Sequence, residues 1–307
     1  RNNFDEIGNV ATQGVGGAVI RTGNVAEMKS NGMELSISST NIKTKDFTWS
    51  TNFVYSYTNT EITKLMNRGR VIDLVKGNGY ALQGYPARAL FSIPFVGISD
   101  NGLPMVLNEK GEVTSDDINF QERNKTSYLK YEGPTDPKYT GSLGNTFSYK
   151  GFHLNIFMTY SFGNVVRLDP VFKAKYNDLA SMTKVFKNRF VQSGDEYRTN
   201  VPGIVDYRDY NKNRSLRQGY NAYNYTTVRT AKGDFIRMKE ISLAYDFPAK
   251  WLSHTPVNRM SLKLQATNLF LIYADKKLNG QDPEFFNSGG VAAPLPKQFT
   301  LTLKVGL

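Results

Sequence analysis

The sequence contains no cysteine and only two histidines in 307 residues. Without cysteine there is neither a disulfide framework nor a cysteine-based metal site. Its absence does not indicate whether the protein works in an oxidising or a reducing compartment. The two histidines, His153 and His254, are far apart in the sequence and too few for a histidine-rich metal centre. We therefore expect no metal site and no cofactor.

Long apolar runs are also absent. A transmembrane helix needs about 18 or more consecutive apolar residues, which occur nowhere in the chain, and residues 1–8 lack the apolar core of a signal peptide. A soluble protein is one explanation. A transmembrane β-barrel is another, because its strands alternate lipid-facing and lumen-facing residues and cross a bilayer without an apolar run. In the second case the chain is processed or is a piece of a longer one.

The sequence contains few residue patterns that are typical of a catalytic site. The acidic pairs Asp116 with Asp117 and Asp195 with Glu196 lie in polar, loop-like sequence, where nothing apolar would raise a carboxyl pKa as glycosidase chemistry requires. Neither a glycine-rich phosphate loop nor a nucleophile elbow occurs. We therefore expect a protein that is not an enzyme.

Positive charge exceeds negative charge, with 38 Lys and Arg against 27 Asp and Glu and a formal net charge of +11. The basic residues are scattered through loop-like stretches such as 184–198 and 208–217, with no compact basic helix. This spread argues against a nucleic-acid partner. It is typical of a cationic surface among anionic lipid head groups.

Aromatic residues and glycine are abundant, with 19 Phe, 18 Tyr and 26 Gly, which favours strands and turns. Apolar and polar residues alternate in segments that mostly span about ten residues, close to the nine to eleven that cross a bilayer and longer than the five or six usual in soluble strands. Tyr and Phe lie toward the segment ends, as in interfacial girdles. Seven strands are predicted, at residues 33–42, 47–60, 139–149, 154–162, 241–247, 260–264 and 299–307.

The alternation also predicts which side chains face lipid. The apolar positions of each strand share one face, and hydroxyls, amides and some charges share the other. The side chains predicted to face lipid are Leu154, Ile156, Met158, Leu262, Leu264, Leu301 and Leu303.

The links between strands alternate in length. Short links at 43–46, 150–152 and 248–259 alternate with long ones at 61–138, 165–234 and 273–298. Outer-membrane barrels have short periplasmic turns and long external loops. The fold class predicted is all-β, a transmembrane antiparallel β-barrel with structured extracellular loops.

The two longest loops contain patterns of their own. Residues 86–98 and the apolar run 103–107 predict short strands, and Asp169 followed by Pro170 predicts a helix start. Aromatic residues at helical spacing extend that helix to about Phe190. Five tyrosines are candidates for contact with substrate or with a lid, because their rings can stack and their hydroxyls can bond: Tyr207, Tyr210, Tyr220, Tyr223 and Tyr225.

Several short motifs, in this order, make the chain resemble the C-terminal region of the SusC/RagA family of TonB-dependent outer-membrane transporters of Bacteroidetes. Each is weak alone, and together they extend over nearly the whole chain. They are Gly32-Met33-Glu34-Leu35, Gly84-Tyr85-Pro86, residues 136–152, residues 235–245, Asn268-Leu269-Phe270 and Asp282-Pro283-Glu284.

The resemblance implies that residues 1–307 are the C-terminal part, about seven spanning strands, of a barrel of about 22 strands with a plug domain. Signal peptide and plug would lie upstream of Arg1. It also implies location in the outer membrane among lipid and lipopolysaccharide, and loops at the cell surface. The implied partners are a SusD-like lipoprotein, TonB through the upstream part, and a glycan or peptide substrate.

Two alternatives to an importer remain open at this point. The chain could be a structural component of an outer-membrane assembly or secretion complex that reuses the same fold, since a fold does not fix a function. It could also be a soluble β-rich carbohydrate-binding protein, since soluble sandwiches alternate as well.

Overall fold

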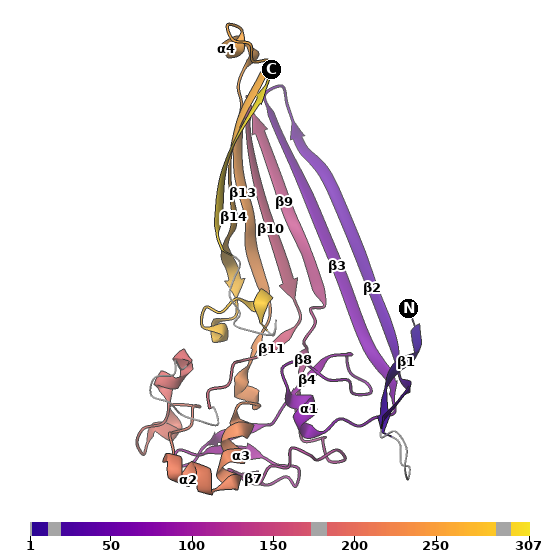
Figure 1. Ribbon diagram of the computed structural model, residues 1–307, viewed down its shortest axis with the longest axis vertical. Helices are drawn as coiled ribbons and strands as arrows, with labels where there is room; N and C mark the ends of the chain where they lie inside the picture. The colour runs from indigo at the N-terminus through magenta and orange to yellow at the C-terminus, as the bar shows by residue number, and fades with distance from the viewer. Residues whose placement is uncertain (1, 12–19, 173–182, 287–295) are drawn as a thin grey trace.

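The computed structural model describes residues 2–11, 20–172, 183–286 and 296–307. Its main element is one antiparallel sheet of eight strands in the order β1-β2-β3-β9-β10-β13-β14-β15. The sheet forms a long curved wall, with short turns at one end and a folded domain at the other (Figure 1). Its strands are β1 (Asn2–Ala11), β2 (Ile20–Lys43), β3 (Phe47–Leu65), β9 (Tyr139–Tyr149), β10 (Phe152–Phe162), β13 (Phe235–Asp246), β14 (Arg259–Ala274) and β15 (Gln298–Gly306).

All seven predicted strands are present, and β9 has the predicted bounds. Most of the others are longer than predicted. The wall also contains β1, which pairs with residues 20–29 of β2 and which strand alternation does not predict. No helix in the described parts of the chain is long and apolar enough to cross a membrane.

The turn between β9 and β10 shows how local sequence fixes the wall. Tyr149 pairs with Phe152, which leaves the two-residue loop Lys150-Gly151. Both residues have positive φ, 46° and 88°. This is the backbone of a type I′ hairpin turn, whose twist matches that of the flanking strands, and glycine adopts it without strain. The short links all lie at this turn end of the wall, and the long ones at the opposite, loop end (Figure 1).

The smaller elements lie mostly in the two longest loops and form what we call the loop domain. It has three small β-units, of β4 with β8, of β5 with β6 and β7, and of β11 with β12. The short helix α4 (Ala249–Leu252) lies instead in the third short link. The loop-domain elements are α1 (Val71–Val75), β4 (Ala89–Ser92), β5 (Phe95–Ile98), β6 (Pro104–Leu107), β7 (Val113–Thr114), β8 (Lys130–Pro134), β11 (Val165–Arg167), α2 (Tyr207–Lys212), α3 (Arg214–Tyr223) and β12 (Thr230–Lys232).

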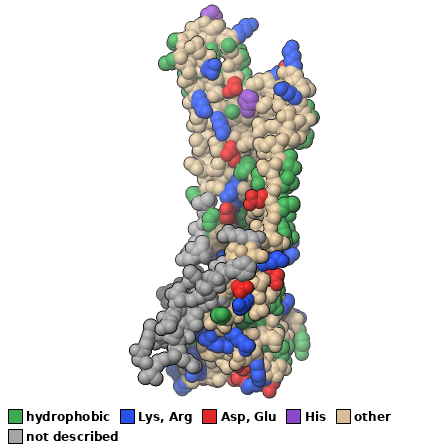
Figure 2. Space-filling view, turned by 90° about the vertical axis from the view of Figure 1, so that its right-hand side faces the viewer, with side chains coloured by type: hydrophobic (Ala, Val, Ile, Leu, Met, Phe, Trp, Pro, Cys, Tyr) green, Lys and Arg blue, Asp and Glu red, His purple; other side chains and the backbone are tan. Residues whose placement is uncertain are grey.

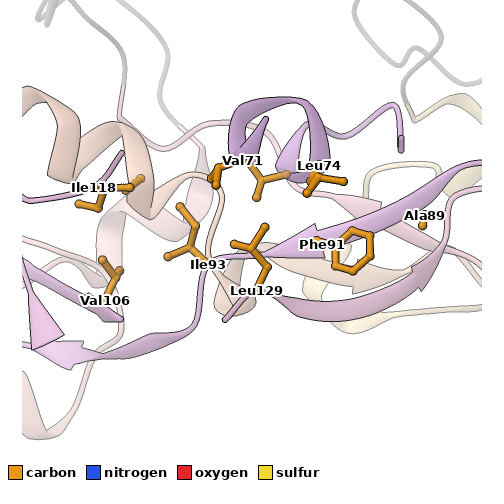
Figure 3. Packing of buried hydrophobic residues seen from close by; sticks show 10 residues of the cluster. Val71, Leu74, Ala89, Phe91, Ile93, Val106, Ile118 and Leu129 are labelled. Carbon is orange, nitrogen blue, oxygen red and sulfur yellow. The ribbon is translucent and has the colours of Figure 1, made fainter. Parts of the chain in front are cut away.

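The hydrophobic core lies in the loop domain. In Figure 3, Val71 and Leu74 of α1 face Phe91 of β4, and the cluster continues to Ile118 and Val106 of β6. Val71 is completely buried and Leu74 is 1% exposed. Burial of this apolar surface drives folding of the loop. The described parts of both long loops are therefore ordered by their own core, as the apolar runs in them predict.

The helix predicted from Pro170 to Phe190 is wrong where the structure describes it. Residues 171–172 form a bend, Lys184–Asn188 is a 3-10 helix, and residues 173–182 lie outside the described residues. The Asn224 side chain accepts from the backbone N–H groups of Val171 and Phe172 and donates to the Phe172 carbonyl. The Asn224 side chain thus takes the Phe172 carbonyl, which a helix would use for an intrahelical bond. The α-helices in the described part of this loop are α2 and α3, capped by Asp206 and Asn213.

Candidate transport surface

One face of the wall, which we call the outer face, is apolar. The strand register places Leu154 beside Leu243, Leu243 beside Leu264, and Leu264 beside Leu301. Leu264 is 54% exposed and Leu301 69% exposed. A row of leucines across four strands, exposed on β13, β14 and β15, is unfavourable in water and favourable in hydrocarbon. The seven side chains predicted to face lipid all lie on this face.

Aromatic side chains border the apolar band at both ends of the strands. Their rings contact one another across neighbouring strands, with centroids 4.4 to 5.7 Å apart. This matches the aromatic girdles that mark the two interfaces of a bilayer. The pairs are Trp49 with Phe147 and Phe152 with Tyr245 at the turn end, and Tyr57 with Tyr139 at the loop end.

The opposite, inner face is polar and hydrogen-bonded from strand to strand. Near the turn end, His153 Nδ1 lies 2.8 Å from Ser148 Oγ and its Nε2 lies 3.1 Å from Asp246 Oδ2. One layer further in, Asn155 Nδ2 donates to Glu240 Oε1 at 3.4 Å. His153 is thus part of a polar ladder near the rim of the wall.

A buried charge cluster holds the last loop against the inner face. Arg237 of β13 and Asp282 are each 4% exposed and form an ion pair. Arg237 Nε also lies 2.8 Å from Glu284 Oε2, and Lys239 Nζ lies 3.1 Å from Glu284 Oε1. Loss of one partner in such a cluster would leave an uncompensated buried charge, which is costly. The segment 276–286 is therefore fixed to the wall.

A hollow of about 560 Å³ with a mixed polar and apolar lining lies on the inner face at the loop end. The hydroxyl oxygen of Thr159 and the amide oxygen of Asn164 are buried there without a hydrogen-bond partner among the described residues. The charges at its edge are paired, Arg88 with Asp136 at 2.6 Å and Lys239 with Glu284. A neutral ligand bearing hydroxyls or amides suits this chemistry. The lining includes Arg88, Thr135, Thr140, Thr159, Asn164 and Glu284.

A buried arginine joins the two long loops. Arg167 of β11 donates to the Phe91 carbonyl at 2.6 Å and Ser92 Oγ at 3.0 Å in the first loop, and to the Thr226 carbonyl at 2.8 Å in the second. Burial lowers the pKa of Arg167 to about 9, so the guanidinium stays charged at neutral pH. The loop domain is therefore one assembly above the hollow.

The five candidate tyrosines lie on α2, α3 and the segment that follows α3. Tyr220 and Tyr223 are buried in the loop-domain core, and the Tyr220 hydroxyl donates to the Gly203 carbonyl at 2.8 Å. Tyr210 packs edge-on against Tyr220, Tyr225 packs edge-on against Phe120, and Tyr207 begins α2. The structure places Tyr210, Tyr220, Tyr223 and Tyr225 in or against the loop-domain core and not in the lining of the hollow, whereas the side chain of Tyr207 lies outside the described part of the structure. Ligand contact by the five tyrosines stays a prediction.

The acidic pairs occupy surface turns. Asp117 pairs with Lys110 at 2.7 Å, and Asp195 accepts from the N–H groups of Val191 and Gln192. Those backbone bonds hold the pKa of Asp195 below its usual value, whereas a glycosidase acid needs a raised one. Among the described residues no group of His, Cys, Asp and Glu is placed to hold a metal ion.

Together these features define the class of the protein. A wall of long antiparallel strands with an apolar outer face, aromatic borders, a polar inner face and large loops at one end belongs to a transmembrane β-barrel of the outer-membrane type. The soluble carbohydrate-binding alternative does not account for the exposed leucine row.

Comparison with known sequences gives the relatives. The chain is 25% identical over 277 residues to TonB-dependent receptor P3 of Formosa agariphila, covering 85% of this chain and 26% of that receptor. It is 28% identical over 304 residues to TonB-dependent receptor SusC of Bacteroides thetaiotaomicron, covering 93% of this chain and 27% of SusC. No family model matches.

Comparison with solved structures gives the fold. A chain of the RagAB peptide importer in the 'open-open' state superimposes with a TM-score of 0.72 at 19% identity, over 100% of this chain and 32% of that one. A structure of the RagAB peptide transporter gives a TM-score of 0.69 at 21% identity, over 99% and 32% of the two chains.

The chain thus has TonB-dependent receptors, SusC among them, as homologues along most of its length. It spans 26% and 27% of the two receptors compared. Its strands are those of an outer-membrane barrel protein, as the resemblance noted in the sequence implies.

Proposed function

We propose that the chain is the C-terminal part of the barrel of an outer-membrane active transporter, not an enzyme, that imports bulky nutrients, either oligosaccharides or peptides. The observation that carries the proposal is the hollow on the inner face, lined by residues of the wall and of the loop domain. A wall that only anchors a protein in lipid has no need of such a ligand-sized hollow. The named relatives include SusC and the RagAB peptide importer, which supports import as the activity.

We further propose two partners. A SusD-like surface lipoprotein would close over the loop domain, and TonB would supply energy through a part of the receptor outside this chain. The loop domain suits docking, because its shared core and the Arg167 bonds give it a fixed shape. Rigid surfaces bind partners with little ordering cost.

The test is deletion of residues 171–217 from the full receptor in its native host. This segment carries part of the second loop-domain core, including Val171 and Phe172, but no strand of the wall. We expect the barrel to assemble, because closure depends on strand pairing, while uptake of labelled oligosaccharides or peptides and co-purification of the lipoprotein are lost. A protonophore should abolish the uptake of the wild type.

Unchanged uptake and lipoprotein co-purification in the deletion variant would contradict the proposal. Normal surface assembly with no energy-dependent uptake by the wild type would favour the structural or secretion role instead. Heat-modifiable migration on gels serves as the control for barrel assembly in each variant.

A further inference from the structure

A chain of polar side chains crosses the outer face near its turn end. Ser39 Oγ donates to Asn41 Oδ1 at 2.7 Å, and Asn41 Nδ2 donates to Thr51 Oγ1 at 2.6 Å. Thr51 Oγ1 and Trp49 Nε1 both donate to Asn145 Oδ1, at 2.7 and 2.9 Å. These five residues, from β2, β3 and β9, form what we call the polar inlay.

The polar inlay is on the side of the sheet that faces lipid. Asn145 pairs with Thr51 on one side and with Ile156 on the other, and Ile156 belongs to the apolar outer face. Leu143 and Phe147, two positions away along β9, point to the same side. Polar groups exposed to hydrocarbon are costly unless they are bonded. We therefore expect a partner that places polar atoms against the inlay on the lipid-facing side of the sheet.

The inlay has a free amide donor on Asn145. Trp49 Nε1 can only donate, so the Asn145 atom facing it must be the oxygen. The amide nitrogen of Asn145 has no hydrogen-bond acceptor among the described residues. The ligand must therefore supply acceptor oxygens.

The rim above the inlay is cationic. Lys43, Lys45 and Lys150 are exposed at the adjacent turns, and none forms an ion pair with a described residue. Lys150 Nζ lies 5.3 Å from the centre of the Tyr149 ring. Thr51 is four residues from the strand start at Phe47, so the inlay is about 10 Å below the rim for a tilted strand. Figure 2 shows Lys and Arg side chains at this end of the molecule.

We propose that the polar inlay and its lysine rim bind one phospholipid. The phosphate lies at the lysines, the glycerol esters reach down past Trp49, and an ester carbonyl accepts from Asn145. A second copy of the chain docked about a two-fold axis through this rim would bring the same lysines together, and the like charges would repel. The inference holds whatever the receptor transports.

The test uses the full receptor purified in detergent, with palmitoyl-oleoyl phosphatidylglycerol and phosphatidylcholine as probes. We expect native mass spectrometry to show one phosphatidylglycerol retained by the wild type. In Asn145→Leu, apparent affinity should be about tenfold weaker, the effect of one lost hydrogen bond. Lys150→Ala should reduce the preference for phosphatidylglycerol over phosphatidylcholine.

The matched control is Asn52→Leu, because Asn52 lies one position from Thr51 on the inner face of the same strand. It should retain the lipid like the wild type. Equal retention by Asn145→Leu and Asn52→Leu would overturn the proposal. So would a change of oligomeric state in Asn145→Leu without a change in lipid retention, which would make the inlay a protein contact. Heat-modifiable migration verifies that each variant is folded.

Discussion

At the scale of single residues, Tyr160 lies across Gly141 on the outer face. Its hydroxyl donates to the Val54 carbonyl at 3.0 Å, two strands away. A Cβ at position 141 would overlap both the Tyr160 ring and the Val54 carbonyl oxygen. Glycine is therefore required there so that the tyrosine can bridge β10 to β3 over β9.

We expect Gly141→Ala to destabilise the barrel by about 1 to 3 kcal/mol, the usual cost of overpacking. Urea unfolding in micelles, followed by tryptophan fluorescence, measures this. The control is Gly144→Ala on the same strand, where the nearest atom to a Cβ, in Phe157, is 3.4 Å away. Equal loss in the two variants would show that strand glycine itself, not the tyrosine bridge, matters.

Asp73 in the loop domain contributes to folding stability in a pH-dependent way. Arg70 hydrogen-bonds the carboxylate through its guanidinium, at 2.8 Å, and through its backbone N–H, at 3.1 Å, which lowers the pKa of Asp73. Since the folded pKa is below the unfolded one, near 3.8, the stabilisation is fully present above pH 3.8. It is lost as the pH falls through the folded value.

We therefore expect hydrogen exchange of the α1 backbone to accelerate as the pH is lowered below about 4, after correction for intrinsic exchange. Asp73→Asn should show faster exchange already at neutral pH and a flatter pH dependence. An unchanged pH profile in Asp73→Asn would assign the acid sensitivity to another carboxyl group.

At the scale of elements, we expect arginine substitutions on the two faces of β10 to differ in their cost to folding. Ile156 is on the outer face, and Asn155 is on the inner face beside Glu240. Ile156→Arg should cost about 2 to 4 kcal/mol near the bilayer midplane. Asn155→Arg should be tolerated far better, because Glu240 can pair with it. Folding titrations into lipid vesicles compare the two, and equal damage would mean that the faces are assigned wrongly.

Strand alternation was the most informative signal in the sequence, because a period of two residues is imposed by the pleat itself. β1 lacked it. Its register with β2 shifts between Asn3 and Glu6 and again between Glu6 and Ile7, and such bulges interrupt the two-residue period of a strand. Because of its bulges, β1 could not be predicted from the sequence pattern, whereas the hairpin turn at Lys150-Gly151 could.

The helices and the hollow were harder to predict for different reasons. α2 and α3 are polar and short, and only their caps Asp206 and Asn213 could have indicated them. Strand alternation places the hydroxyl side chains of Thr140 and Thr159 on the polar face. Their meeting with Arg88, Asn164 and Glu284 depends on contacts between distant loops, which no local pattern encodes.

At the scale of the whole molecule, the wall and the loop domain are built by different forces. The wall has little apolar core of its own and depends on backbone pairing and surrounding lipid. The loop domain has buried clusters and a buried arginine that links both long loops. One chain therefore combines a membrane-solvated sheet with a water-solvated domain, joined along the loop end (Figure 1).

The Arg167 contacts also bear on the order in which the wall and the loop domain fold. They join Phe91, Arg167 and Thr226, which are separated by 76 and 59 residues along the chain. Closing such long loops is slow unless the intervening strands have already paired, because β9, β10 and β13 bring their ends together. We therefore expect the loop domain to fold after the strands of the wall have paired. A state with paired strands and an unformed loop domain would then precede the finished chain.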